Sequence, residues 1–178
     1  MNKSKHLVWI DLEMSGLDIS QDIILEVAVI ITDEQLKIVA YGPDLILSAP
    51  NLDLANINPI VHDMHTKSGL LDKIAKSQVS LEHAQDQILN FIKFYGAPKT
   101  MPLCGNSIWQ DKLFLIKYMP KLIDYLHYRV IDVSTVKELV KNWYGVGEFK
   151  KTKTHRALSD IEESINELKY YREHYFVK

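Results

Sequence analysis

Five residues whose types suit metal-dependent hydrolysis are spread along the chain: Asp11, Glu13, Asp111, His155 and Asp160. Asp11 and Glu13 are two positions apart and follow an apolar run over 7–10. Because alternate residues of a strand face the same side, a strand here would bring both carboxylates together. Two buried like charges are unfavourable unless a cation neutralises them. The pair therefore predicts a cation site.

The elements that must position these residues follow from the apolar pattern. The β-branched and apolar runs predict strands over 7–13, 23–32 and 37–47, with short connections typical of an antiparallel meander. Helical spacing predicts a helix over 79–96, with Ser80 as its N-cap and Gly96 just past its end.

The second half alternates strands and helices. Strands are predicted over 101–107 and 127–133, and a helix over 110–119 is predicted to stop at Pro120. A further helix is predicted from Ser134 or Thr135 to about Tyr144, because Thr135 and Glu138 have capping-box spacing. The last helix is predicted over 156–172. This order indicates an α/β domain with a mixed five-stranded sheet and helices on its faces.

These elements place the candidate residues at one end of the sheet. Asp11 and Glu13 lie at the carboxyl end of a strand, where open α/β sheets form their ligand crevices. Asp111 and Asp160 lie near helix starts, and each could instead serve only to favour a helix N-terminus. His155 precedes the last helix; positions five apart on a helix diverge by about 140°, so we expect it in the loop.

Oxygen ligands of this kind suit Mg²⁺ or Mn²⁺ rather than zinc. Two such ions, about 3.5–4 Å apart, are a common device for phosphoryl chemistry. His155 could then act as a general base, because the unperturbed pKa of histidine, about 6.5, allows it to accept a proton at neutral pH. Read separately, a D-x-E pair or a lone histidine also fits an ordinary surface position.

Length and composition predict one domain over residues 1–178, with 47% hydrophobic and 25% charged residues. A net charge of −2 argues against a long nucleic-acid footprint but allows a very short one. The basic N-terminus is neither a signal peptide nor a membrane span, so no membrane association is expected. Cys104 is the single cysteine, which excludes an intramolecular disulfide, leaves an intermolecular one open, and fits a cytoplasmic location.

Four segments together resemble one family: "WIDLEMSGLD", "CGNSIWQDKLFL", "HYRVIDVSTVKEL" and "HRALSDIEESINELKYYR". They are similar to the oligoribonucleases, 3′→5′ exoribonucleases of the DEDDh class with a ribonuclease H-like fold. The resemblance implies that Asp11, Glu13, Asp111 and Asp160 bind two Mg²⁺ or Mn²⁺ ions and that His155 is the base. It also implies a homodimer that cleaves short single-stranded RNA, especially dinucleotides, to 5′-mononucleotides.

The resemblance assigns substrate contacts as well. It implies that Leu17 wedges between two bases, that His65 contacts the substrate near the scissile end, and that Tyr128 stacks on a base across the dimer. The residues that it implies cap the 5′ phosphate are Ser107, Arg129, Ser134 and Thr135. Ser134 and Thr135 also fit helix caps, Tyr128 fits ordinary packing, and Leu17 fits a loop anchor.

One position departs from the family pattern. Ile60 stands where family members usually carry a tryptophan, and isoleucine has no stacking face, so a weaker or altered grip on one base is expected. The nearby His62, Asp63 and His65 could suggest zinc, but no cysteine or second cluster supports it. Two other functions remain open: an exonuclease acting on longer single strands, and a non-catalytic RNA-binding dimer.

Overall fold

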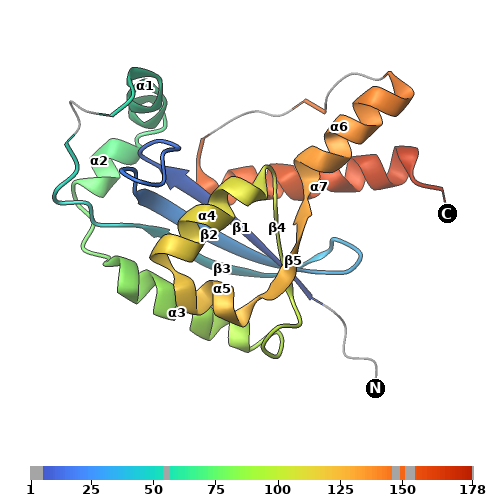
Figure 1. Ribbon diagram of the computed structural model, residues 1–178, viewed down its shortest axis with the longest axis horizontal. Coiled ribbons are helices and arrows are strands. Elements are labelled where there is room, and N and C mark those ends of the chain that lie inside the picture. Colours follow the sequence, from blue (N-terminus) through green and yellow to red (C-terminus); the bar gives the residue numbers. More distant parts are fainter. Residues whose placement is uncertain (1–5, 54–56, 146–148, 151–154, 178) are drawn as a thin grey trace.

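The computed structural model describes residues 6–53, 57–145, 149–150 and 155–177, and a mixed five-stranded sheet lies at its centre (Figure 1). The strands are β1 (His6–Met14), β2 (Ile24–Asp33), β3 (Ile38–Ile46), β4 (Pro102–Gly105) and β5 (His127–Asp132), in the spatial order β3-β2-β1-β4-β5. The first three strands are antiparallel neighbours, and β4 runs parallel to both β1 and β5. The predicted meander and mixed sheet are confirmed.

Seven helices are described: α1 (Pro59–Lys67), α2 (Leu70–Ile74), α3 (Leu81–Lys93), α4 (Ile108–Tyr118), α5 (Pro120–Tyr125), α6 (Val133–Tyr144) and α7 (Ala157–Tyr175). Helices α3, α4 and α5 cover one face of the sheet, and α7 crosses the other (Figure 1). The sheet is thus enclosed between two helical layers, which explains why β1 and β2 are apolar on both faces.

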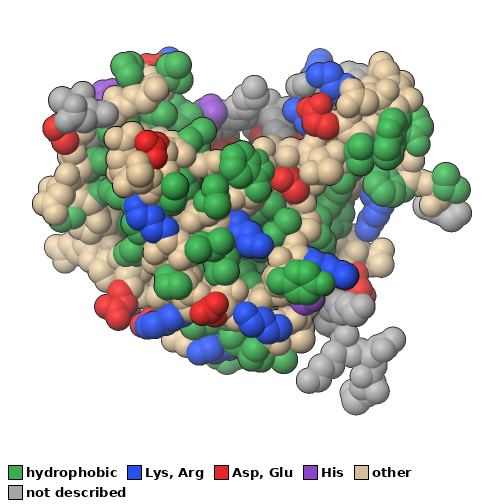
Figure 2. All heavy atoms as spheres, in the orientation of Figure 1, with side chains coloured by type: hydrophobic (Ala, Val, Ile, Leu, Met, Phe, Trp, Pro, Cys, Tyr) green, Lys and Arg blue, Asp and Glu red, His purple; other side chains and the backbone are tan. Residues whose placement is uncertain are grey.

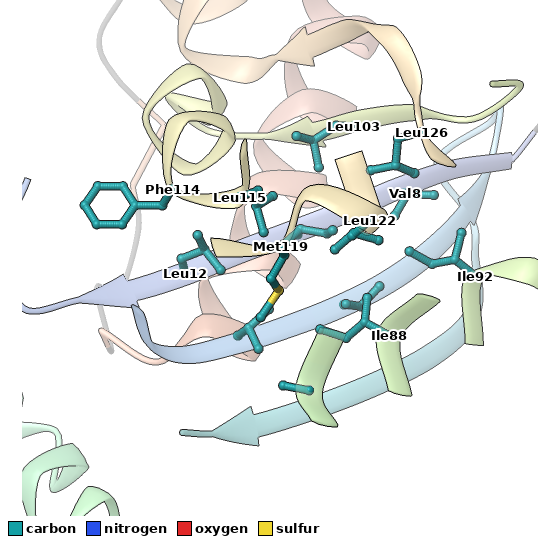
Figure 3. Close-up of a cluster of buried hydrophobic side chains, with 14 of the residues drawn as sticks. Val8, Leu12, Ile88, Ile92, Leu103, Phe114, Leu115, Met119, Leu122 and Leu126 are labelled. Atoms are coloured by element: carbon teal, nitrogen blue, oxygen red, sulfur yellow. The ribbon is translucent and has the colours of Figure 1, made fainter. Parts of the chain in front are cut away.

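The larger apolar cluster joins the sheet to α3, α4 and α5 (Figure 3). Val8 and Leu12 of β1 face Ile88 of α3 and Leu115 of α4, all at most 5% exposed. Each such side chain contributes about 1.5–3 kcal/mol through burial. This packing holds α4, and with it Asp111, against β1.

The opposite face of β1 packs on the last helix. Trp9 is fully buried there and its indole N–H donates to Thr32 Oγ1 at 3.0 Å. Ile161 and Ile165 of α7 belong to the same apolar cluster, which also contains Cys104 of β4. Because α7 is held by this packing, the residues at its start are placed beside the end of β1.

Several predicted boundaries need correction. Helix α6 begins at Val133, and its N-cap is Asp132, whose side chain accepts from the Ser134 N–H; caps at Ser134 or Thr135 were wrong. Pro120 does stop α4, but it also begins α5, because proline fits the first turn of a helix.

Other elements differ less or were missed. Ser80 caps α3 as predicted, although the helix ends at Lys93, before Gly96. Helices α1 and α2 were not predicted. Among the described ranges, no helix is both long enough and apolar enough to cross a bilayer.

Candidate active site

Three carboxylates from the two ends of the chain meet at the end of β1. Asp11 and Glu13 come from that strand and Asp160 from the first turn of α7, and their oxygens include a set lying within 4.8 Å of one another. The period-two geometry of the strand explains why Asp11 and Glu13 point the same way. The cluster predicted from the sequence therefore forms, with these three residues at its centre.

Asp111 approaches the same site from α4 but is not part of that group of three. Its carboxylate is buried, and Oδ1 accepts the backbone N–H of Leu12 at 3.1 Å. Burial raises the pKa of Asp111 to about 7, although the backbone hydrogen bonds oppose the shift. The bond to β1 fixes the distance between α4 and the strand that carries the other carboxylates.

A cavity of about 510 Å³ lies over these groups. All five residues predicted to be catalytic line it, and so do Leu17 and Ser107 of the predicted substrate contacts. Cavities of about 300–1,000 Å³ are usual for small ligands. Its size suits a ligand of a few rings and phosphates.

The electrostatics of the cluster favour a cation. Burial raises the pKa of Glu13 to about 8, and Asp160 and Glu26 add to the shift. The pKa of Asp11 is raised well above its ordinary value, first by burial and then by Asp111 and Glu13. Carboxyl groups that resist ionisation because they are buried and also repel one another are the donor set that a divalent cation would stabilise. The residues present therefore fit a divalent cation.

An ion pair between a partly buried arginine and a fully buried carboxylate holds the segment that carries His155. The Arg156 guanidinium donates to the Glu26 carboxylate through Nε at 3.0 Å to each oxygen and through a terminal nitrogen at 2.6 Å. Glu26 is fully buried on β2, and β2 pairs it directly with Glu13. The Ala157 N–H also points to Glu26, at 3.4 Å, and α7 has no side-chain cap of its own.

This ion pair places the residues on either side of Arg156. His155 lies outside α7, as predicted, with φ of 53°, a left-handed conformation that is uncommon for a residue with a side chain. Asp160 lies one turn into the helix, and its N–H donates to the Arg156 carbonyl at 3.0 Å. Glu26 and Arg156 therefore fix the start of α7 relative to the strand that carries Glu13.

The loop after β1 presents Leu17 to the cavity. Ser15 Oγ donates to Asp22 Oδ1 at 2.7 Å, which closes the loop at its base. Gln110 of α4 donates to the Leu17 carbonyl at 3.0 Å, and Lys117 to the Ile19 carbonyl at 2.6 Å. The loop is tied to α4 on both sides of Leu17, while the Leu17 side chain stays 67% exposed.

His65 is fully buried behind the site. Its Nε2 hydrogen-bonds the Met14 carbonyl at 2.8 Å, and its Nδ1 lies 3.8 Å from Glu13 Oε2. Burial lowers the pKa of His65, which favours the neutral ring. In the described residues His65 forms no three-ligand group with His62 and Asp63, and Asp63 pairs with Lys67 instead.

The remaining predicted substrate contacts do not line the cavity of this chain. Tyr128 and Arg129 are exposed on β5, and Ser134 and Thr135 lie at the start of α6. Asp132 connects this region to the site, because its Oδ1 accepts from the backbone N–H groups of both Ser107 and Ser134 at 2.9 Å.

Several residues around the site were missed by sequence reasoning. Trp109 and Gln110 line the cavity from α4, and Glu26 and Arg156 support it from outside. Glu26 carried a signal, because it is the lone charge inside the apolar run 23–32. Arg156 carried no signal in the sequence beyond its position next to His155.

The comparisons with known proteins agree with this geometry. A family model described as an exonuclease, RNase_T, matches residues 8–168. The oligoribonuclease of Haemophilus ducreyi is 48% identical over 98% of this chain and 98% of its own length. That of Francisella tularensis subsp. tularensis is 47% identical over 97% of each chain, and a probable oligoribonuclease of Dictyostelium discoideum is 47% identical over 96% and 90%.

Solved structures show the same fold at low sequence identity. Exonuclease I from Methylocaldum szegediense superposes with a TM-score of 0.72 at 14% identity, over 96% of this chain. This chain spans only 41% of that protein. S. pombe Pop2p gives a TM-score of 0.65 at 14% identity, over 96% of this chain and 84% of its own. The family model, the full-length relatives and the ribonuclease H-like fold together show that the chain belongs to the oligoribonucleases, metal-dependent 3′→5′ exoribonucleases.

Proposed function

We propose that this enzyme acts best on RNA of two nucleotides and releases 5′-mononucleotides from it. The observation that carries the proposal is the cavity of about 510 Å³ that joins the carboxylate cluster to His155 and Leu17. A net charge of −2 also supports a small substrate, because a long strand is held mainly by cationic contacts to phosphates. A single exonuclease domain over residues 1–178 fits this role.

The proposed chemistry is hydrolysis of a phosphodiester. Two Mg²⁺ or Mn²⁺ ions held by Asp11, Glu13, Asp111 and Asp160 would supply charge neutralisation and Lewis-acid activation at the scissile phosphate. His155 takes a proton from the attacking water, whose oxygen bonds to phosphorus. The bond from phosphorus to the O3′ of the preceding nucleotide breaks, and that oxygen is protonated. Arg156 and Glu26 keep His155 oriented during this transfer.

Substrate contacts are proposed on both sides of the scissile bond. Leu17 is exposed at the cavity and is suited to separate two bases, while His65 supports Glu13 and the end of β1 from behind. Ser107 is suited to contact the 5′ phosphate. A cap over that phosphate would leave no path for a longer strand, which would explain selection for dinucleotides.

The remaining contacts are proposed to come from Arg129, from the start of α6 and from Tyr128 of a second copy of the chain. Arg129 and Tyr128 are exposed on β5 and lie outside the cavity of their own chain. Ser134 and Thr135 lie at the start of α6, where the Ser134 N–H shares the Asp132 carboxylate oxygen with the N–H of Ser107. An Arg with hydroxyl groups forms a suitable phosphate clamp, and a tyrosine can stack on a base. In a homodimer Tyr128 would reach the partner's cavity, while Arg129, Ser134 and Thr135 would complete the phosphate cap.

An apolar groove supports the homodimer. It has a volume of about 250 Å³ between α6 and the end of α7, and its lining includes Leu139, Trp143, Tyr144 and Phe176, all at least 39% exposed. Figure 2 shows hydrophobic side chains exposed over this part of the surface. We expect sedimentation velocity to give a dimer and Trp143→Ala to weaken it. A monomeric wild-type protein would contradict the cross-subunit contact of Tyr128.

The test of the function is substrate length. We expect hydrolysis of a 5′-phosphorylated diadenylate, with Mg²⁺ or Mn²⁺ added, to exceed that of a twenty-nucleotide RNA in kcat/KM. Asp160→Asn is the inactive control. Faster cleavage of the long strand would favour an exonuclease for longer RNA, and binding without turnover would favour a non-catalytic role.

A cytoplasmic location is proposed because the whole chain contains one cysteine.

A further inference from the structure

The cavity wall includes one large aromatic side chain that none of the roles above uses. Trp109 is the second residue of α4, two positions before Asp111 and two after Ser107. It lines the same cavity as the carboxylate cluster and Leu17. Among the described residues, Trp109 and His155 are the two whose aromatic rings line this cavity.

Packing does not explain Trp109. The core side of α4 is filled by Phe114 and Leu115, both fully buried, whereas Trp109 is 59% exposed. A large aromatic side chain gains stability by burial, and this one has most of its surface free. Its exposed indole is therefore available to a ligand in the cavity.

The loop that carries Leu17 is held to α4 at the residue next to Trp109. Gln110, the next residue, donates to the Leu17 carbonyl at 3.0 Å, so the loop that carries Leu17 is tied to the first turn of α4. One apolar branched side chain and one indole thus face the same cavity from two connected elements. This arrangement suits a flat nucleobase, because every base has a π-face that stacks on an aromatic ring.

Position 60 cannot offer such a surface. Ile60 is 79% exposed on α1 and does not line the cavity, although its neighbours Val61 and Met64 do. We propose that Trp109 stacks on one base of the RNA substrate and so supplies the aromatic surface that Ile60 lacks. This inference rests on the proposed action on dinucleotides for its choice of substrate, and it identifies a specificity residue for that site.

Fluorescence provides the direct test, because the chain has three tryptophans. Trp9 is fully buried, and Trp143 lines a different groove. We expect a diadenylate with a non-cleavable phosphonate linkage to quench the tryptophan emission of the wild type. The emission of the Trp109→Phe variant should stay almost unchanged. Equal quenching of the two proteins would overturn the proposal.

Kinetics provide the second test. Trp109→Leu should raise KM for 5′-phosphorylated diadenylate about 5- to 150-fold, the range for losing one base–aromatic stack, with little change in kcat. Trp109→Phe should retain most of the affinity, since phenylalanine keeps a stacking face. Phe94→Leu, a matched change at an exposed position on the end of α3, should leave KM unaltered.

Abasic substrates separate stacking from a structural effect. On the dinucleotide that lacks the stacked base, Trp109→Leu and the wild type should have the same KM. An equal loss on the intact substrate and on both abasic ones would overturn the proposal, as would no loss on the intact substrate.

Two further results are informative. Leu113 and Ile116 extend an exposed apolar row along α4 from Trp109, and Figure 2 shows hydrophobic side chains over this helix. A changed sedimentation coefficient for Trp109→Leu would overturn the proposal in favour of an interface.

If the wild type cleaved only longer RNA, the dinucleotide preference would fail. The abasic comparison at the 3′ end of a longer strand would then support or overturn the role of Trp109.

Discussion

Replacing Arg156 with methionine should destabilise the protein strongly, because it leaves the Glu26 carboxylate buried without a positive charge beside it. Glu26 is fully buried, and the Arg156 guanidinium reaches it at 2.6–3.0 Å through two nitrogens. Breaking a buried pair by removing one member costs about 3–5 kcal/mol. That is at least about a fifth of the typical stability of a domain, about 5–15 kcal/mol.

A control pair in the same chain separates burial from distance. Lys67 and Asp63 also approach to 2.6 Å, but their side chains are 75% and 63% exposed. Exposed pairs contribute about 0–1 kcal/mol, so Lys67→Met should change the free energy of unfolding by no more than that. Two ion pairs with the same N–O distance are thus expected to differ severalfold in their contribution to the free energy of unfolding.

The assay is urea unfolding followed by circular dichroism. With an m-value of about 2 kcal/mol/M, Arg156→Met should lower the midpoint by roughly 1.5–2.5 M. The double variant Glu26→Gln/Arg156→Met should recover much of that loss, because no uncompensated charge remains, while RNA cleavage stays impaired through the misplaced His155. The reasoning would be refuted if Arg156→Met cost less than about 1 kcal/mol, or if the double variant were no more stable than the single one.

Three further predictions concern the carboxylates and the loop. Asp11→Asn should lower kcat on diadenylate by more than about 100-fold, the upper limit for residues that only orient a metal ligand. Near-wild-type turnover would contradict the role of Asp11 as a metal ligand. Burial raises the pKa of Glu13 from 4.5 to about 8, so between these pH values the folded, metal-free protein holds a proton that the unfolded chain has lost. Its stability should therefore fall as pH rises through that window; thermal unfolding in EDTA should show the slope, Glu13→Gln should reduce it, and Mn²⁺ should restore stability at pH 8. Leu17→Ala should raise KM for diadenylate more than it lowers kcat, because Leu17 touches the cavity while its loop is held by backbone contacts; a pure kcat effect in steady-state kinetics would disagree.

The strands of the fold could be predicted because their signals are local. The run 23–32 is β-branched and continuous, and β2 spans Ile24–Asp33 with nine of its ten residues buried. The helices that were missed lack such a signal. His65 is the one buried residue of α1, so the helix has no apolar stripe, and α2 is only five residues long.

The chemistry of the carboxylate cluster was predictable from residue type, but the contacts that hold the cluster in place were not. Asp11, Glu13 and Asp160 meet because acidic residues at a strand end and a helix start share one edge of the sheet. The contact between Glu26 and Arg156 joins residues 130 positions apart, and no local spacing indicates it. Asp132 replaced Ser134 and Thr135 as the cap of α6 for a similar reason, since all three are good caps and only the backbone decides among them.

The position of Cys104 has a practical consequence. The thiol lies fully buried on β4, and burial raises its pKa, so the native fold offers no reactive thiolate to a solution reagent. A second cysteine introduced at an exposed site could therefore be labelled with a maleimide dye while the native one stays silent. In partly denaturing solvent, the rate at which the Cys104 thiol reacts would measure how often the β-sheet opens.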